Sequence, residues 1–265
     1  MGTYQTARTH LKRSVSLAKT LEACIANVSH PKKSTVVGFG ILIQQRRLSQ
    51  SILLLGRNHA FESRILFRSM MECHFNYKWI LLFHKEYRAN RFLRFHPLEQ
   101  YRVHESLSGF LDPVDYHAKE KELKSRLREV RHLFRKKKRK GKLIWDSTWA
   151  SVTSFKDRLM EVLKYESNKN DEFLYGLYRL TSSTVHVSPI SVFQTIEKNL
   201  PLRAKMQPES ETENQIKGAF LILMDSIRTL AEETSMIEDL EPELSRLERI
   251  ATTRLTKQVS AGRVR

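Results

Sequence analysis

The stretch AFESRILFRSMMECHFNYKWILLF (Ala60–Phe83) is apolar around nearly its whole circumference when it is drawn as an α-helix. Successive residues of a helix are about 100° apart, so the apolar side chains cover every side except one narrow charged stripe. These side chains are Ile65, Leu66, Phe67, Met70, Met71, Cys73, Phe75, Tyr77 and Trp79. A helix that is apolar nearly all round is a buried helix, so the stretch predicts a helix inside the protein.

The rest of the chain has the composition of long helices joined by few turns. It contains only 9 Gly and 7 Pro among 265 residues, fewer turn residues than a protein of many short strands needs. Hydrophobic periodicity predicts an all-α helical bundle of about eight helices. The other expected helices are Thr3–Val28, Thr35–Leu55, Glu86–Leu107 with a break at Pro97, Val114–Phe134, Ser154–Tyr165, Asp171–His186 and Gln215–Glu238, with an extra helix after Asp239.

The chain is strongly basic, with a net charge of +17 and 46 Lys and Arg residues. Such a charge indicates a polyanionic partner or a solvated basic surface. The densest basic block forms the candidate nucleic-acid-binding set Arg135, Lys136, Lys137, Lys138, Arg139, Lys140 and Lys142. A block of this kind is usually a solvated loop or a mobile arm that contacts polyanions. Trp145 and Trp149 follow it, and they either stack on single-stranded bases or pack in the core.

Several other classes of protein have no support in the sequence. The longest apolar runs, which begin at Val36 and Ile52, are far shorter than the ~20 residues that cross a bilayer, so no membrane partner is expected. Cys24 and Cys73 are the only cysteines and have no metal-ligand spacing. The chain has no nucleotide-cofactor or metalloprotease motif, so we expect no cofactor and no metal. The amino-terminal sequence has no apolar secretion signal, and we expect a cytoplasmic protein.

The charged stripe of Ala60–Phe83 consists of Arg64, Arg68 and Glu72, each four residues from the next. Because the helix is buried, the stripe is expected to be partly buried as well, and buried charges are costly unless they are paired. One interpretation is an internal Arg68–Glu72 ion pair that fixes helix register. The other is that the stripe faces a polar cavity and positions a histidine from another helix.

A second polar helix face occurs in YRLTSSTVHVSP (Tyr178–Pro189). Arg179 and His186 are seven residues apart, a rotation of about 700°, so they lie within about 20° of each other. Histidine transfers protons near neutral pH, and arginine matches phosphate oxygens with a planar set of donors. The pair therefore suits phosphodiester chemistry. The alternative is that His186 is an ordinary histidine at a helix carboxyl end, stabilised by the helix dipole.

These two stretches resemble known families. Arg-x6-His near the end of a late helix resembles the R-x4–6-H signature of HEPN (higher eukaryotes and prokaryotes nucleotide-binding) domains. The fuller pattern is similar to a bacterial family of unknown function that has LxRSxxE, then an aromatic–Ile pair, and far downstream Y-x-x-x-S-x-x-x-H. The matching segments here are LFRSMME from Leu66, Trp79-Ile80 and YRLTSSTVH from Tyr178. The resemblance covers about Leu53 to Pro189.

The resemblance implies a HEPN-like helical bundle, commonly a homodimer whose two Arg–His faces form one cleft. For many members it also implies metal-independent endoribonuclease activity that leaves a 2′,3′-cyclic phosphate, in toxin–antitoxin or antiviral defence systems. An antitoxin or defence-system protein is then a possible partner. The candidate catalytic residues are Arg179, His186, Glu72 and Arg68, and the candidate substrate-binding residues are Tyr175, Ser182, Ser183 and Arg64.

One position departs from the pattern of active HEPN nucleases. These usually carry Asn, Asp or His directly after the motif arginine, whereas this chain has Leu180. A non-catalytic nucleic-acid-binding or scaffold subunit of a defence complex is therefore the alternative function. On this reading the expected organisation is N-terminal helices at 1–52, a HEPN-like core at 53–200 with a basic loop at 135–142, a packing helix at 201–240 and a basic C-terminal tail at 241–265.

Overall fold

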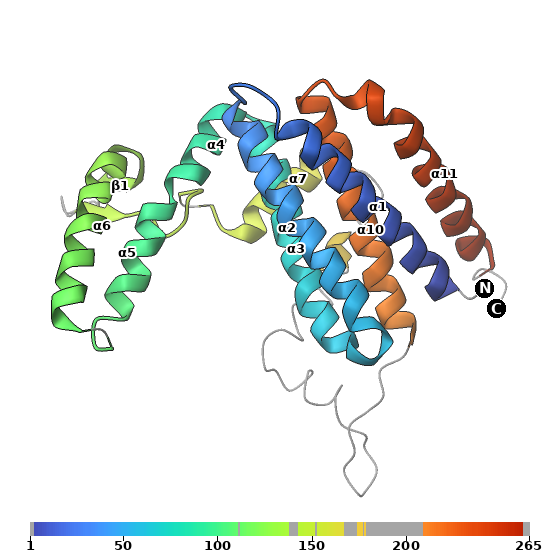
Figure 1. Ribbon diagram of the computed structural model, residues 1–265, viewed down its shortest axis with the longest axis horizontal. Coiled ribbons are helices and arrows are strands. Elements are labelled where there is room, and N and C mark those ends of the chain that lie inside the picture. The colour runs from blue at the N-terminus through green and yellow to red at the C-terminus, as the bar shows by residue number, and fades with distance from the viewer. Residues whose placement is uncertain are drawn as a thin grey trace, which may run out of the picture.

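The computed structural model describes residues 3–110, 112–137, 143–151, 153–166, 174–176, 178 and 209–261. Within these ranges the chain forms nine α-helices, one 3₁₀ turn and one pair of short strands (Figure 1). The expectation of an all-α bundle of about eight helices is confirmed. None of the helices in these ranges is long and apolar enough to span a lipid bilayer.

Four helices form the centre of the molecule. They are α1 (Thr3–Ile25), α2 (Lys33–Leu55), α3 (Ala60–Leu82) and α10 (Glu209–Glu233), and the turn η1 (Gly56–His59) joins α2 to α3. Helix α2 packs against α1 and α3, and α10 packs against all three (Figure 1). The buried side chains at their interfaces include Leu11, Leu21, Leu42, Ile52, Phe67, Met70, Met71, Phe75, Ile80, Leu223, Ile227 and Leu230. The burial predicted for α3 is confirmed, because its apolar sides meet neighbours in three directions.

Two further helices pack on the outside of this bundle. Helix α7 (Phe155–Glu166) packs against α3, and α11 (Ile237–Ala261) packs against α10. The inner face of α11 buries Leu240, Leu244 and Leu247, spaced as one side of a helix requires. Arg228 of α10 pairs with Glu241 and Glu248 of α11 at 3.0 and 2.9 Å. These contacts fix α11 as a regular helix on the bundle surface.

The middle of the chain forms a lobe to one side of the bundle. Helix α4 (Lys85–Arg94) leads out of the bundle to α5 (His96–Ser106) and α6 (Pro113–Phe134), which pack against each other (Figure 1). An antiparallel hairpin follows, made of β1 (Arg135–Lys137) and β2 (Leu143–Trp145), in which Arg135 lies opposite Trp145. The lobe therefore carries β1, which is the start of the basic block, away from the centre of the bundle.

Several helix ends are fixed by the residues expected at such positions. Pro97 lies in the first turn of α5, where its missing N–H costs nothing. Asp112 caps α6 by accepting hydrogen bonds from the N–H groups of Val114 and Asp115. Ser154 and Asp157 form a reciprocal cap at the start of α7, in which each side chain accepts from the other's backbone N–H.

Helix α2 is capped from outside its own segment. Its first N–H groups, those of Lys33 and Ser34, donate to the two carboxylate oxygens of Glu86 on α4 at 3.0 and 3.2 Å. Burial opposes ionisation of Glu86, but these hydrogen bonds and that of the Ser34 side chain outweigh it and lower the pKa of Glu86. The bundle and the start of the lobe are thus joined by a helix cap.

Three sequence expectations differ from the structure. The block 135–142 was expected to be a loop, but Arg135–Lys137 forms the strand β1, because it pairs with β2 at Leu143–Trp145. The division after residue 52 falls inside α2, which is one continuous helix in the bundle core. An extra helix was expected after Asp239, with a basic tail at 241–265. The helix is present as α11, and it continues through this segment to Ala261.

Candidate functional site

The charged stripe predicted on α3 is present and partly buried. Arg64 is 7% exposed, and the side chains of Arg68 and Glu72 are 16% and 41% exposed. Arg68 Nε donates to Glu72 Oε1 over 3.0 Å, so the expected ion pair is formed. Arg68 Nη1 is buried and has no hydrogen-bond partner within the described ranges. Since an unpaired buried donor is costly, this guanidinium retains the capacity to bind another acceptor.

Tyr178 brings the second polar stretch to the stripe. The Arg68 guanidinium carbon lies 5.3 Å from the centroid of the Tyr178 ring, within the range of a cation–π contact. The same ring packs against Phe155 of α7, with centroids 5.2 Å apart. Leu174 is buried and Tyr175 is half-buried against the core. The two segments, far apart in the sequence, therefore meet in space.

The remaining candidates of this stretch, Arg179, Ser182, Ser183 and His186, lie outside the described residues. Tyr178 is the last residue before them that the structure describes.

Arg158 of α7 lies beside the stripe and was not predicted from the sequence. It is 5% exposed. Its Nε donates to Asn76 Oδ1, one helical turn after Glu72, over 3.0 Å, and its Nη1 donates to the carbonyl oxygen of Thr153 over 2.7 Å. Both acceptors are uncharged, so hydrogen bonds hold this cation without neutralising it.

Two rings and two carboxylates form the wider surroundings of Arg158. Its guanidinium carbon lies 5.2 Å from the Trp149 ring centroid and 5.8 Å from that of Phe155. Burial lowers the pKa of Arg158, and the more distant charges of Asp157 and Glu72 partly oppose this. The seam, by which we mean the contact between α3 and α7, therefore holds Arg68, Arg158 and Glu72 beside aromatic rings, with Asp157 at its edge.

Trp79 joins α3 to α7 at the other end of their contact. Its indole Nε1 donates to Glu161 Oε2 of α7 over 2.6 Å. Arg88 of α4 lies over the Trp79 ring at 3.6 Å, donates to the Trp79 carbonyl oxygen and approaches Glu161 to 3.6 Å. Helices α3, α4 and α7 are thereby tied together, which fixes the position of the seam.

A separate buried charge cluster joins α3 to α10. His74 Nδ1 and Lys78 Nζ lie 3.8 and 3.2 Å from Asp225 Oδ2. The His74 and Lys78 side chains are almost fully buried, and that of Asp225 is 35% exposed. Because the Asp225 carboxylate compensates the buried Lys78 ammonium, this cluster serves to hold the two helices in register.

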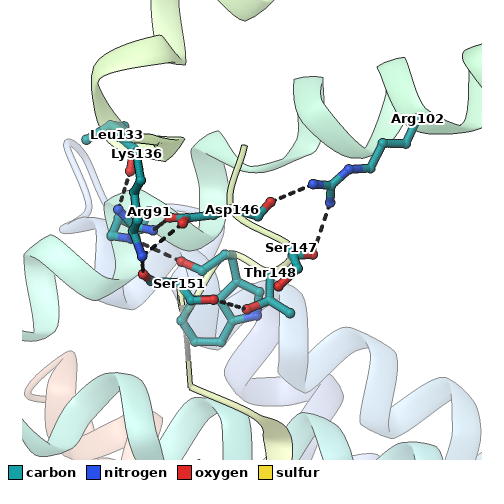
Figure 2. A network of polar contacts seen from close by, with 9 residues as sticks. Arg91, Arg102, Leu133, Lys136, Asp146, Ser147, Thr148 and Ser151 are labelled. Atoms are coloured by element: carbon teal, nitrogen blue, oxygen red, sulfur yellow. Dashed lines mark hydrogen bonds and ion pairs between the residues drawn. The ribbon is translucent and has the colours of Figure 1, made fainter. Parts of the chain in front are cut away.

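The base of the basic hairpin is anchored by Asp146, the residue that follows β2. Its two carboxylate oxygens bind different cations: Oδ2 pairs with Arg91 Nη2 at 2.8 Å and Oδ1 with Lys136 Nζ at 2.9 Å (Figure 2). Arg91 also donates from Nε to the Trp149 carbonyl oxygen over 3.0 Å and from Nη1 to that of Leu133. One guanidinium thus joins α4, the end of α6 and the segment after the hairpin.

Arg102 of α5 completes this anchor. It donates to the carbonyl oxygens of Asp146 and Ser147 over 2.5 and 3.0 Å (Figure 2). Lys136 donates in addition to the hydroxyl of Ser151. The hairpin base is therefore held by α4 and α5 together.

The structure describes the side chains of only two candidate nucleic-acid-binding residues, Arg135 and Lys136. The Arg135 guanidinium lies 5.7 Å from the Trp145 ring centroid, and Lys136 is committed to Asp146. Of Lys137 the structure describes only the backbone, which pairs with Leu143. Lys138, Arg139, Lys140 and Lys142 lie outside the described residues. The first two cations of the block thus have structural partners.

A family model described as "Family of unknown function (DUF5677)" matches residues 35–199, more than half of the chain. The chain belongs to this family. No curated protein and no solved structure gave a significant match. The DUF5677 range runs from α2 through α7 and includes the α3 stripe, the basic hairpin and Tyr178–Pro189.

Three charged residues in the DUF5677 range that shape these sites were missed by sequence reasoning: Arg91, Asp146 and Arg158. Arg91 and Asp146 pair across 55 positions of sequence, a separation that periodicity within one helix cannot reveal. For Arg158 one signal existed, because it lies in an amphipathic helix and belongs to its buried side.

Two other features bear on the chemistry of the DUF5677 stripe. Cys24 is exposed and Cys73 is half-buried, and both thiols are free. Burial, with a smaller contribution from the Glu72 carboxylate, raises the pKa of Cys73 to about 11, so its thiol is protonated at neutral pH. Within the part of the chain that the structure describes, no three His, Cys, Asp or Glu side chains gather as a metal site.

Proposed function

We propose that this protein is a HEPN-like, metal-independent endoribonuclease that targets RNA in the cytoplasm, as an effector of a bacterial toxin–antitoxin or antiphage defence system. The observation that carries the proposal is the contact between Arg68 and Tyr178, since Tyr178 directly precedes Arg179. It supports a shared site for the RSMME stripe and the YRLTSSTVH stretch, in keeping with the resemblance to HEPN domains.

The proposed reaction uses the residues of both segments. His186 accepts the proton of the 2′-hydroxyl, and the 2′-oxygen attacks the adjacent phosphorus. The bond to the 5′-oxygen breaks, that oxygen takes up a proton, and a 2′,3′-cyclic phosphate remains. Arg179 and Arg68 stabilise the charge that develops on the phosphorus oxygens, and Glu72 orients Arg68 through the 3.0 Å hydrogen bond.

Binding of RNA is the role proposed for the remaining candidates. Tyr175, Ser182, Ser183 and Arg64 contact the nucleotides next to the cleaved bond. The basic block at the hairpin supplies affinity that does not depend on sequence, because phosphate neutralisation releases counterions. A homodimer that joins two such faces, held inactive by an antitoxin or defence partner, completes the proposal.

A non-catalytic nucleic-acid-binding or scaffold subunit is the second candidate function. Leu180, in the position after the motif arginine, favours it. The Arg68–Glu72 ion pair is also what a purely structural stripe requires.

The test is cleavage of RNA by the purified protein in the presence of EDTA. We expect wild-type protein to produce fragments ending in 2′,3′-cyclic phosphate, and His186→Ala to lower the rate by about 100-fold or more, the usual contribution of a positioned general base. End-group analysis of the fragments by mass spectrometry identifies the product.

His117→Ala is the matched control, because His117 is an exposed histidine on α6 with a side chain 74% accessible. It should cleave as the wild type does. Equal cleavage by the His186 and His117 variants would remove His186 from the mechanism. RNA binding without cleavage by any form of the protein would favour the binding-subunit alternative.

A further inference from the structure

Arg158 and Arg91 are both deeply buried arginines, but they differ in how their charge is compensated. Arg91, 8% exposed, places its charge against Asp146 at 2.8 Å. Arg158, 5% exposed, has no carboxylate within ion-pair distance in the described ranges, and donates only to the neutral oxygens of Asn76 and Thr153. A buried cation without an ion-paired carboxylate is costly, and such perturbed groups gather at functional sites.

The donors of Arg158 are only partly used. A guanidinium has five N–H groups, and two of these five have acceptors among the described residues. Arg68, on the other side of Glu72, has a buried Nη1 that also lacks an acceptor there. Glu72 is ion-paired with Arg68, whereas Arg158 has no carboxylate within ion-pair distance in the described ranges, and the charges of Asp157 and Glu72 act on it only from farther away.

Aromatic rings bridge the two guanidinium groups. Arg68 lies 5.3 Å from the Tyr178 ring, Tyr178 and Phe155 are 5.2 Å apart, and Arg158 lies 5.8 Å from Phe155. These rings pack beside both cations and limit their contact with water, while the 41% exposure of the Glu72 side chain opens the seam to solvent at that edge. A desolvated cation binds an incoming anion more strongly than an exposed one.

We propose that Arg158 and Arg68 form a phosphate-binding site at the seam between α3 and α7. A phosphate has oxygens on several sides, so it accepts hydrogen bonds from two planar guanidinium groups at once. The inference that phosphate binds at this site does not depend on the proposed catalysis. The identification of this phosphate as one carried by RNA rests on the proposed function.

The test measures binding to the full-length protein by calorimetry, with thermal unfolding as a second readout. The probes are inorganic phosphate, potassium chloride at matched ionic strength, and a short 2′-O-methylated oligoribonucleotide, which cannot form a cyclic product. We expect phosphate to bind and to raise the Tm above the chloride value, and Arg158→Gln to weaken phosphate binding about tenfold or more, as loss of a charge-assisted contact predicts.

Two further variants make the result specific. Arg158→Lys keeps the charge but not the planar fork, so it should bind phosphate more weakly than wild type and more strongly than Arg158→Gln. Arg46→Gln is the control at a distance, because Arg46 is a half-buried arginine paired with Glu22 at 2.6 Å between α1 and α2. It should retain the full phosphate response.

Each result has a separate meaning. No phosphate-specific binding by the wild type, which requires no variant to fold, would overturn the inference, and so would unchanged binding by Arg158→Gln. Oligonucleotide binding that is indifferent to Arg158→Gln would overturn it while leaving the proposed function standing. Phosphate binding that depends on Arg158, without oligonucleotide binding, would support the site for a free phosphate and count against RNA as its source.

Discussion

Gly38 of α2 faces Tyr77 of α3 and Leu230 of α10. A Cβ built on Gly38 would lie 2.6 Å from Tyr77 Cζ and 2.8 Å from Leu230 Cδ1, nearer than side-chain atoms approach each other. The Tyr77 hydroxyl is buried at this crossing, and burial, with the charge of Glu233, raises the pKa of Tyr77. A glycine is thus required so that a tyrosine of α3 can fill the space between α2 and α10.

Replacement of this glycine tests the packing directly. Gly38→Ala should lower the free energy of unfolding by about 1–3 kcal/mol, the usual cost of overpacking a core. Gly40→Ala, two residues along the same helix with no atom within 4 Å of the new Cβ, should be neutral or stabilising by up to ~1 kcal/mol, since alanine favours the helix. Urea unfolding of both variants measures this, and an equal effect at the two positions would contradict the packing described here.

Helix positions were largely predictable from the sequence, whereas the contacts between helices were not. Sequence analysis placed the starts of α1 and α3 at Thr3 and Ala60, as observed, because long apolar periodicity within one segment is a local signal. The break before Pro97 was equally local. The strand β1 was missed because its partner lies beyond the basic residues, and a run of Arg and Lys has no apolar alternation to reveal it.

The hairpin and α4 depend on one carboxylate, so Asp146→Asn should loosen both. The substitution removes the charge that compensates Arg91 and Lys136, and breaking a buried pair in this way costs about 3–5 kcal/mol. We expect faster amide hydrogen exchange in α4 and the hairpin, with the α1–α2–α10 core unchanged. Glu122→Gln, which removes an exposed partner of Arg126 on α6, should leave exchange as in the wild type. Protected amides throughout the Asp146 variant would show that the anchor lies elsewhere.

Of the candidate site, the part on α3 was predictable from the sequence and the part on α7 was not. The α3 stripe followed from residues spaced by four on one helix, and the structure places Arg68 against Glu72 as that spacing requires. Arg158 comes from a helix more than 80 positions away, and its link to Asn76 depends on how α7 lies on α3. Such a contact is a property of the folded chain and leaves no periodic mark in the sequence.

The net charge of +17 over the whole molecule makes a polyanion the expected partner, and the basic block provides the means to test where that partner binds. Because Arg135 and Lys136 have structural contacts, the test replaces only Lys138, Arg139 and Lys140 by Glu. We expect weaker RNA binding, with the slope of log K against log salt reduced by roughly 2, as loss of three phosphate contacts predicts. Titrations at several salt concentrations supply the slope.

A second variant controls for net charge alone. Lys12, Arg13 and Lys19 are exposed residues of α1, and their replacement by Glu lowers the net charge equally. This variant should keep the wild-type slope if the block at the hairpin is the binding element. The same slope change in both variants would mean that RNA responds to the overall charge and has no preferred contact there.

The contrast between the two cysteines has a practical consequence for labelling the protein. Cys24 is exposed on α1, whereas Cys73 is half-buried on α3 and its thiol stays protonated at neutral pH. A maleimide dye should therefore attach at Cys24 without mutagenesis. A single fluorophore on α1 reports the rotational diffusion of the bundle. Anisotropy of that dye then distinguishes one copy from two in solution and follows complex formation with unlabelled oligonucleotides.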